Sequence, residues 1–156
     1  METPNCTHCD LQAEDIKKAF NFLTSDEAEK LCPYLELREW EKDAIVMKEG
    51  EFGDYMGFVV DGKLAVKKQT DYWGKQIIIA ILDRGTMVGE GAFIVQGPRS
   101  NTVVAMEKSK LLILTAGRMD GLVLNSPMLA IKLLKHMLHI MSLRLRKAGD
   151  RISEVL

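Results

Sequence analysis

A series of short β-type runs, interrupted at close intervals by turns that contain glycine, constrains the fold of this chain more than any other feature. Asp61-Gly62, between two of the runs, predicts a β-hairpin. Many short strands at such close spacing predict an antiparallel barrel or roll. The runs, rich in apolar and β-branched residues, cover residues 35–40, 44–48, 57–60, 63–68, 76–82, 101–106 and 110–115.

Helical patterns precede the β-type runs. Apolar residues recur at helical spacing between residues 11 and 23, which predicts a first helix. Thr24 followed by Glu27 forms a capping box, so we expect a second short helix to begin there. Pro33 lacks the backbone N–H that a helix interior needs, and it is expected to end this second helix.

Two more helices are expected after the last run. One covers residues 118–124, and a long one starts with Ser126 as N-cap and Pro127 at the first helical position. Strands in the middle and helices at both ends predict the fold class as α+β, mainly β. The expected architecture is an antiparallel β-roll, jelly-roll-like, with N-terminal helices and a long C-terminal helix.

The long C-terminal helix carries two apolar stripes. The first, here called the seam, alternates steps of three and four residues, as in a coiled coil. The second stripe continues as Arg144 and Lys147, so the second half of the helix is expected to keep only a partner face. We therefore expect a homodimer paired through the seam. The seam is Ile131, Leu134, Leu138, Met141, Leu145, Ala148, Ile152 and Val155, and the second stripe is Ala130, Leu133, Met137 and Ile140.

Composition limits the function. The chain has 156 residues, 47% apolar and 28% charged, which is typical of one globular domain. A net charge of −1 and a pI near 6.3 argue against broad electrostatic binding to nucleic acid. No run of 18 apolar residues is present, and the N-terminus lacks the apolar core of a secretory signal. We expect a cytoplasmic protein that does not enter a membrane.

Metal and enzyme chemistry find little support in the sequence. Cys6 and Cys9 form a Cys-x-x-Cys pair in residues 1–10, which have no periodic pattern, but further ligands are missing. We interpret this pair as two reduced thiols. His136 and His139 lie on the long helix without a carboxylate partner, and the β-type runs contain no histidine. We therefore expect that the chain has no metal site and no catalytic residue and that it is not an enzyme. This expectation also excludes a cupin-like metalloenzyme.

The stretch that interrupts the β pattern carries binding chemistry. Residues 89–99, expected to be irregular, place a cluster of glycines before Pro98-Arg99-Ser100. Glycine lets backbone N–H groups approach a ligand closely, and a run of such groups binds anions. Arg99 offers a planar fork of donors for phosphate oxygens, and Glu90 offers acceptors for sugar hydroxyls. Phosphate at one end and ribose at the other describe a nucleotide.

This stretch resembles the phosphate-binding cassette of the cyclic-nucleotide-binding domain family, which includes catabolite activator proteins and kinase regulatory subunits. The turn glycines Gly50, Gly53, Gly62 and Gly85 also fall where the family places them, and the resemblance covers residues 20–156. It implies three parts: an N-terminal helical segment 1–34, the β-roll 35–116 with the cassette 88–102, and residues 117–156 with the short helix and the dimerisation helix.

The resemblance also implies roles for single residues. Glu90 would bind the ribose 2′-hydroxyl, with Gly89 and Ala92 nearby. Arg99 would pair with the cyclic phosphate, and Ser100 would add a hydroxyl and a backbone donor. The sequence departs from the family at two cassette positions, namely Gly91, where a larger apolar residue is usual, and Asn101, where a small one is common.

The base is harder to assign. In relatives, hydroxyl residues on the long helix meet the adenine amino group, and Ala148 and Gly149 stand there in this chain. Ser100, directly after the arginine, fits a contact with guanine. The cations Arg144, Arg146 and Arg151 are expected to be solvated rather than stacked on a base.

The predicted function is a cyclic-nucleotide sensor with cAMP as the preferred ligand and cGMP as the second candidate. Transcription-factor relatives carry a helix-turn-helix domain after the long helix, and this chain stops at Leu156. A stand-alone domain without direct DNA binding, which acts on an unidentified downstream protein, is therefore expected. The alternative is a degenerate domain that binds another ligand or acts as a dimeric interaction module.

Overall fold

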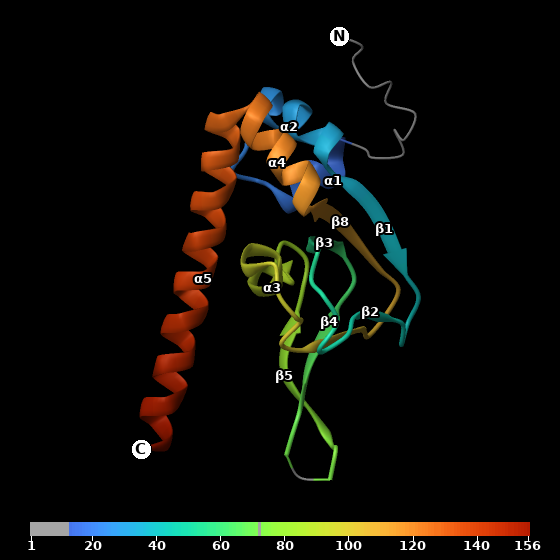
Figure 1. Cartoon of the computed structure of the whole chain (residues 1–156), viewed down its shortest axis with the longest axis vertical. Coiled ribbons are helices and arrows are strands. Elements are labelled where there is room, and N and C mark those ends of the chain that lie inside the picture. The colour runs from blue at the N-terminus through green and yellow to red at the C-terminus, as the bar shows by residue number, and fades with distance from the viewer. Residues whose placement is uncertain (1–12, 72) are drawn as a thin grey trace.

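The computed structural model describes residues 13–71 and 73–156 and consists of two antiparallel sheets with helices before and after them (Figure 1). The helices are α1 (Ala13–Ala19), α2 (Ser25–Leu31), α3 (Glu90–Val95), α4 (Ala116–Asn125) and α5 (Pro127–Val155), with a 3-10 turn η1 (Cys32–Tyr34). The strands are β1 (Glu36–Trp40), β2 (Ile45–Met47), β3 (Tyr55–Asp61), β4 (Leu64–Gln69), β5 (Gln76–Leu82), β6 (Met87–Val88), β7 (Thr102–Ala105) and β8 (Ser109–Thr115).

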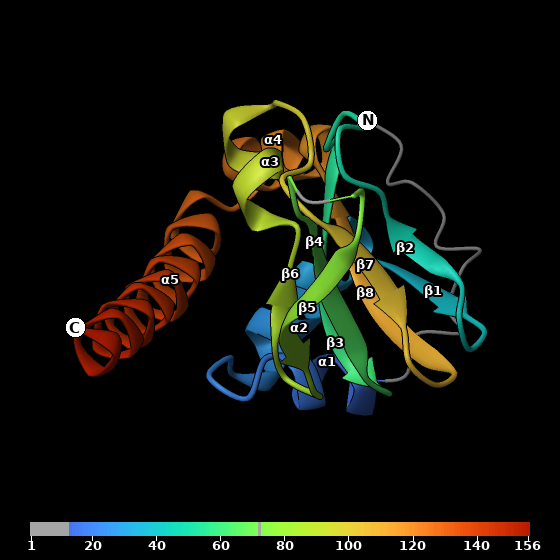
Figure 2. The same ribbon diagram turned by 90° about the horizontal axis from the view of Figure 1, so that it is seen from below.

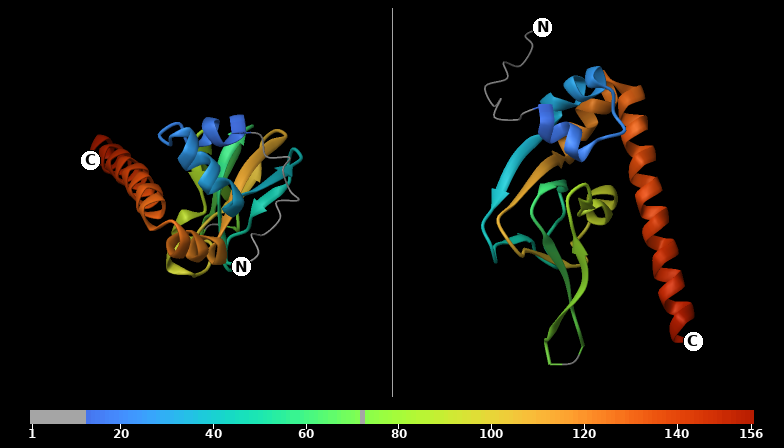
Figure 3. Two further views of the ribbon diagram at one scale, coloured as in Figure 1. Left: turned by 90° about the horizontal axis from the view of Figure 1, so that it is seen from above. Right: turned by 180° about the vertical axis from the view of Figure 1, so that it is seen from behind.

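The strand order confirms the predicted fold class. One sheet has the order β1-β8-β3-β6 and the other the order β2-β7-β4-β5, and every pairing is antiparallel. Figure 2 shows the sheets folding over one another, and Figure 3 (right) shows α1, α2 and α4 gathered at one end of the β-roll.

Alternation along β3 and β8 divides the interior into two cores. Because neighbouring residues of a strand point to opposite faces, Met56 and Phe58 pack against the helices, while Val59 lies between the sheets. The first core adds Leu112 and Leu114 to residues of α1, α2, α4 and α5. The second joins the two sheets through Val46, Met47, Leu64, Val88, Val103, Leu111 and Ile113.

The predicted strands are found with small changes in their ends, and one expectation about them is wrong. Asp61-Gly62 forms a tight turn, with Gly62 at φ +91°, but β3 and β4 belong to different sheets, so no β-hairpin forms there. A Cβ atom on Gly62 would lie 2.3 Å from the Ser109 hydroxyl oxygen. The glycine therefore permits a close approach to β8. The two-residue strand β6 is too short to leave a pattern in the sequence.

The N-terminal helices follow their sequence signals. The predicted capping box is present: the Glu27 amide donates to the Thr24 hydroxyl at 3.2 Å, and the Thr24 amide donates to the Glu27 carboxylate at 2.8 Å. The first helix ends at Ala19, earlier than expected, and its predicted beginning lies outside the described residues. Residues 1–10, with Cys6 and Cys9, also lie outside them.

The N-terminus of α5 corrects a detail of the prediction. Ser126 occupies the N-cap position and Pro127 follows it, as expected, but the Ser126 hydroxyl makes no capping hydrogen bond. Its backbone carbonyl instead accepts the Ala130 amide at 3.0 Å. In the part of the chain that the structure describes, no helix combines the length and apolarity needed to cross a membrane.

The two stripes of α5 have different environments. Ala130, Leu133 and Met137 of the second stripe are buried against the helical end of the β-roll. In the seam, Leu138 is 64% exposed and Leu145 is 75% exposed. Figure 1 shows α5 running beside the β-roll along one side of the molecule. The chain therefore buries most of the second stripe and leaves much of the seam uncovered.

His136 gives this helix a pH-dependent contact. Its ring stacks on Phe22, with ring centroids 3.9 Å apart and an interplanar angle of 20°. Burial lowers the pKa of His136 below the ordinary 6.5, and the nearby His139 lowers it further. The unfolded chain binds a proton at His136 more readily than the folded chain does. The contribution of neutral His136 to the free energy of unfolding is therefore complete above about pH 6.5 and is lost as the pH falls below that value.

We therefore expect wild type to lose more stability than His136→Gln between about pH 7.5 and about pH 5.5. Urea unfolding at the two pH values measures this difference. The exposed His139 serves as the control. His139→Gln should lose nearly as much stability between the two pH values as wild type does. Equal losses in wild type and His136→Gln would contradict the assignment of the proton to His136.

Candidate functional site

A cavity of about 540 Å³ lies between the cassette, strand β5 and the second half of α5. All seven residues predicted to bind ligand line this one cavity: Gly89, Glu90, Gly91, Ala92, Arg99, Ser100 and Asn101. Apolar side chains from the sheets complete its wall, namely Met47, Val66, Ile79, Ile81, Leu82, Val88 and Val103. The structure thus gathers the predicted residues, and adds apolar neighbours whose membership the sequence pattern did not indicate.

The cassette is more regular than expected. Residues 89–99 were expected to be irregular, but Glu90–Val95 form helix α3. Gly89 precedes it with φ +80°, and a Cβ atom there would lie 2.6 Å from a terminal nitrogen of Arg99. Glycine is therefore required at this position by both conformation and space. Phe93 anchors α3 in the core, and a helix this short shows no clear apolar period in the sequence.

Backbone hydrogen bonds fasten the cassette to the turn that precedes β3. The Arg99 amide donates to the Glu51 carbonyl at 2.7 Å, and the Gly50 amide donates to the Arg99 carbonyl at 2.8 Å. Phe52 and Pro98 form an antiparallel bridge next to the Arg99–Glu51 bond, and the Gly53 amide donates to the Gly97 carbonyl at 2.9 Å on its other side. The turn glycine and the cassette, far apart in the sequence, therefore form one unit that fixes the Arg99 backbone.

The Arg99 side chain is a buried cation that has no carboxylate partner among the residues that the structure describes. It is only 5% exposed, and its two terminal nitrogens donate to the carbonyls of Gly89 at 3.1 Å and Tyr55 at 2.6 Å. The guanidinium carbon lies 4.7 Å from the centroid of the Tyr55 ring. Burial lowers the pKa of Arg99, against the influence of Tyr55 and Asp54. Within residues 13–71 and 73–156, Arg99 forms no ion pair.

The other cassette positions have simpler environments. Lys68 Nζ donates to the Ser100 carbonyl at 2.7 Å, and the side-chain amide of Asn101 donates to the Ser100 hydroxyl at 3.1 Å. A Cβ atom added to Gly91 would meet nothing within 4 Å. The departure from a larger residue at Gly91 is therefore not imposed by lack of space.

Helix α5 forms another part of the cavity wall. Arg144, Lys147, Ala148 and Arg151 line the cavity. The expectation that Arg144 is solvated is wrong: one of its terminal nitrogens lies 2.6 Å from Glu90 Oε1, and the other donates to the Met87 carbonyl at 2.6 Å. Sequence reasoning missed this contact, because the positions are 54 residues apart and only the fold brings them together.

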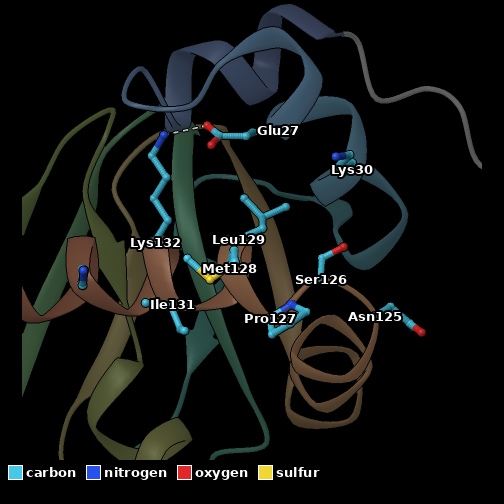
Figure 4. Close-up of a pocket in the computed structure, with 10 residues that line it drawn as sticks. Glu27, Lys30, Asn125, Ser126, Pro127, Met128, Leu129, Ile131 and Lys132 are labelled. Carbon is cyan, nitrogen blue, oxygen red and sulfur yellow. Dashed lines mark hydrogen bonds and ion pairs between the residues drawn. The ribbon is translucent and has the colours of Figure 1, made fainter.

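A second cavity, of about 550 Å³, lies where α4 meets α5 near α2 (Figure 4). It contains no cassette residue. Two of its charged lining residues form an ion pair, with Lys132 Nζ 2.7 Å from Glu27 Oε2. This hydrogen bond lowers the pKa of Glu27. Among the described residues, no cluster of three or more His, Cys, Asp or Glu side chains could hold a metal ion.

Comparisons with known proteins agree with this geometry. A sequence model of the cyclic nucleotide-binding domain matches residues 37–126. A crystallised cyclic nucleotide-binding domain from Methylobacillus flagellatus is 27% identical, with a TM-score of 0.86 over 92% of this chain and 84% of that one.

Two curated relatives extend the comparison. The cyclic AMP receptor protein of Thermus thermophilus is 26% identical over 83% of this chain, and the cAMP-dependent protein kinase regulatory subunit of Mycosarcoma maydis is 34% identical over 55% of it. This chain spans 57% of the receptor protein and 16% of the kinase subunit.

Proposed function

Because this chain belongs to the cyclic nucleotide-binding domain family, we propose that it is a regulatory sensor that binds a cyclic nucleotide in the cassette cavity. The preferred ligand is cAMP, and cGMP is the second candidate. Curated relatives include proteins named for cAMP and for cGMP, and those named for cAMP reach 36% identity against 29% for those named for cGMP, which favours this order.

The buried Arg99 is the observation that carries the proposal. A charged group taken out of water is costly unless an opposite charge compensates it. In the described residues Arg99 has only carbonyl dipoles and an aromatic ring as partners, and it lines a cavity of about 540 Å³. A phosphate monoanion in this cavity would supply the missing charge, and its geometry suits the guanidinium fork.

The remaining cassette residues would bind the rest of the ligand. The first N–H groups of any α-helix have no partner inside the helix, and in α3 these belong to Glu90, Gly91 and Ala92, which all line the cavity. The Glu90 carboxylate would accept a hydrogen bond from a ribose hydroxyl. The apolar side chains of β5 on the opposite side would cover the base.

Signalling would pass through α5, which lines the cavity with Arg144, Lys147, Ala148 and Arg151 and leaves much of the seam exposed. Ala148 belongs to both the cavity wall and the seam. We propose that two protomers pair through the seam. The alternative function, a dimeric interaction module with a degenerate site, would use the same seam but leave Arg99 without an anion. The uncompensated charge of Arg99 favours the sensor.

Isothermal titration of the ligand-free protein with cAMP, cGMP and a cyclic dinucleotide tests the proposal. Binding of cAMP or cGMP with one site per protomer is the expected result. Binding of neither would contradict the sensor, and binding of the cyclic dinucleotide alone would change its ligand class.

The same titrations should show weak discrimination between cAMP and cGMP. Ala148 lines the cavity, but neither it nor Gly149 has a side-chain donor or acceptor for a base edge. Without such a partner, the penalty that rejects the wrong base is small. We expect a preference below about a thousandfold, or roughly 4 kcal/mol. A larger ratio would mean that other residues read the base.

A further inference from the structure

The ring of Tyr55 lies against the guanidinium of Arg99, which is proposed to bind the phosphate. The guanidinium carbon is 4.7 Å from the centroid of the ring. The terminal nitrogens of the same side chain donate to the carbonyls of Gly89 and Tyr55. Hydrogen bonds restrain the planar guanidinium at its edge, whereas an aromatic ring restrains it at its face. The ring therefore adds a contact that the two carbonyls cannot supply.

Tyr55 is itself held by neighbours in both sheets. Its hydroxyl donates to the Val46 carbonyl of β2 at 2.6 Å, although Tyr55 belongs to β3 in the other sheet. The guanidinium carbon of Arg38, on β1, lies 5.4 Å from the centroid of the same ring. The ring also packs against the core between the two sheets. Its position is therefore set by contacts within the chain.

The two cations that contact this ring differ in how their charge is compensated. Glu36 accepts two hydrogen bonds from Arg38, at 2.8 Å and 3.3 Å, and raises the pKa of Arg38. Arg99, in contrast, forms no ion pair with any residue that the structure describes. An aromatic ring attracts a cation through its quadrupole but carries no net charge. Tyr55 can therefore orient Arg99 without neutralising it, and the positive charge stays available to a phosphate.

We propose that Tyr55 is a positioning residue, whose ring holds the guanidinium of Arg99 in the orientation that binds the ligand phosphate. This inference rests on the proposed function, because it assigns a role within the same site. Tyr55 is not among the described residues that line the cavity, so it acts through Arg99 rather than on the ligand. The two residues are 44 positions apart, which hides their contact from any local sequence pattern.

The size of the effect follows from the freedom that Arg99 would regain without the ring. Arginine is one of the side chains that lose the most rotamer freedom when they are fixed. A ligand that finds the guanidinium already in place is spared part of this cost. Without the ring, we expect the affinity for cAMP to fall by about 3- to 30-fold, about 0.7–2 kcal/mol.

Isothermal titration with cAMP should compare wild type, Tyr55→Leu and Tyr55→Phe. Leucine removes the ring but leaves the main-chain carbonyl that Arg99 contacts, and it should cause the expected loss. Tyr55→Met is a second variant without the ring. Phenylalanine keeps the ring and removes only the hydrogen bond to Val46. Tyr55→Phe should therefore bind cAMP within about threefold of wild type, although its thermal unfolding midpoint should be lower. A purely structural role would make affinity follow stability instead.

Tyr34 provides the matched control. Like Tyr55 it is half-buried and forms a hydrogen bond through its hydroxyl, which accepts from the side-chain amide of Asn125 at 3.1 Å. Tyr34 does not line the cassette cavity and does not contact Arg99. Tyr34→Leu should therefore lower the unfolding midpoint and keep the wild-type affinity for cAMP.

A second comparison tests whether Tyr55 acts through Arg99. Arg99→Lys retains a positive charge for the phosphate but replaces the planar fork with a compact ammonium, which has no flat face for the ring to orient. Adding Tyr55→Leu to Arg99→Lys should therefore change the affinity by less than about twofold, about 0.4 kcal/mol. Thermal unfolding shows that each variant is folded at the temperature of the titrations.

Three results would overturn the inference. Wild-type affinity in the folded variants without the ring would show that the ring is not needed. An equal loss in Tyr55→Phe and Tyr55→Leu would assign the effect to the hydroxyl and its contact between the sheets. The same loss in Arg99→Lys as in wild type would show that Tyr55 does not act through the guanidinium. In all three cases wild type still binds cAMP, and the sensor function stands. Binding of neither cAMP nor cGMP to wild type would overturn the proposed function itself.

Discussion

Replacing Arg99 with alanine is expected to weaken cyclic-nucleotide binding by about 2–5 kcal/mol, the range for removing one member of a buried charge pair. This corresponds to a loss of roughly 30-fold to several thousandfold in affinity. The effect is large because Arg99 is 5% exposed and lines the cavity without a carboxylate partner in the described residues. Isothermal titration with cAMP measures the loss.

Arg84 is the matched control for this substitution. It is a surface arginine whose side chain is 58% exposed and pairs with Asp61 at 3.3 Å, so Arg84→Ala should leave affinity nearly unchanged. Because Arg99 also donates to the carbonyls of Gly89 and Tyr55, thermal unfolding of Arg99→Ala must show that the variant is folded. A folded variant with wild-type affinity would refute the phosphate assignment.

The second large effect is expected in the seam. Leu145→Asp should convert a seam-paired dimer into monomers, because each protomer would place an aspartate in the apolar interface opposite its symmetry mate. Burying an unpaired charge costs several kcal/mol per ion. Leu145 is 75% exposed in the protomer, so the substitution should not disturb its fold. Sedimentation velocity at micromolar concentration gives the oligomeric state.

A control on the same helix separates the seam from general effects on α5. Leu143 is 39% exposed and is not a seam position, so Leu143→Asp should leave the dimer intact. Leu138→Asp, in the seam, should act like Leu145→Asp. Monomeric wild type under these conditions would rule out the seam as a dimer interface, and dimeric seam variants would place the interface elsewhere.

All strands except β6 were predictable, because each of them has apolar residues in sufficient number between clear turn signals. Which strands pair with one another was harder to predict from the sequence. Asp61-Gly62 has the composition of a β-hairpin, yet the strands on either side pair with other partners in two sheets. A local turn signal reports that the chain reverses tightly, whereas strand partners depend on the packing of the whole sheet.

The site shows the same division between local and distant information. The cassette residues lie within 13 positions, so their chemistry and spacing were visible together. Helix α3 was missed because its six residues span less than two turns. The contact of Arg144 with Glu90 was missed because charge on an exposed helix face is usually solvated, and no local pattern marks a partner 54 residues away.

The length of α5 turns it into a lever. At a rise of 1.5 Å per residue, Arg144 lies about 10 Å along the helix from Met137, and Val155 lies about 27 Å from it. Met137 is buried in the core and Val155 is exposed, so a rigid helix that turns about a point near Met137 moves further at Val155 than at Arg144. A shift of about 1 Å at Arg144 therefore becomes a shift of about 2.5 Å at Val155. The free end of the helix magnifies small changes at the cavity wall.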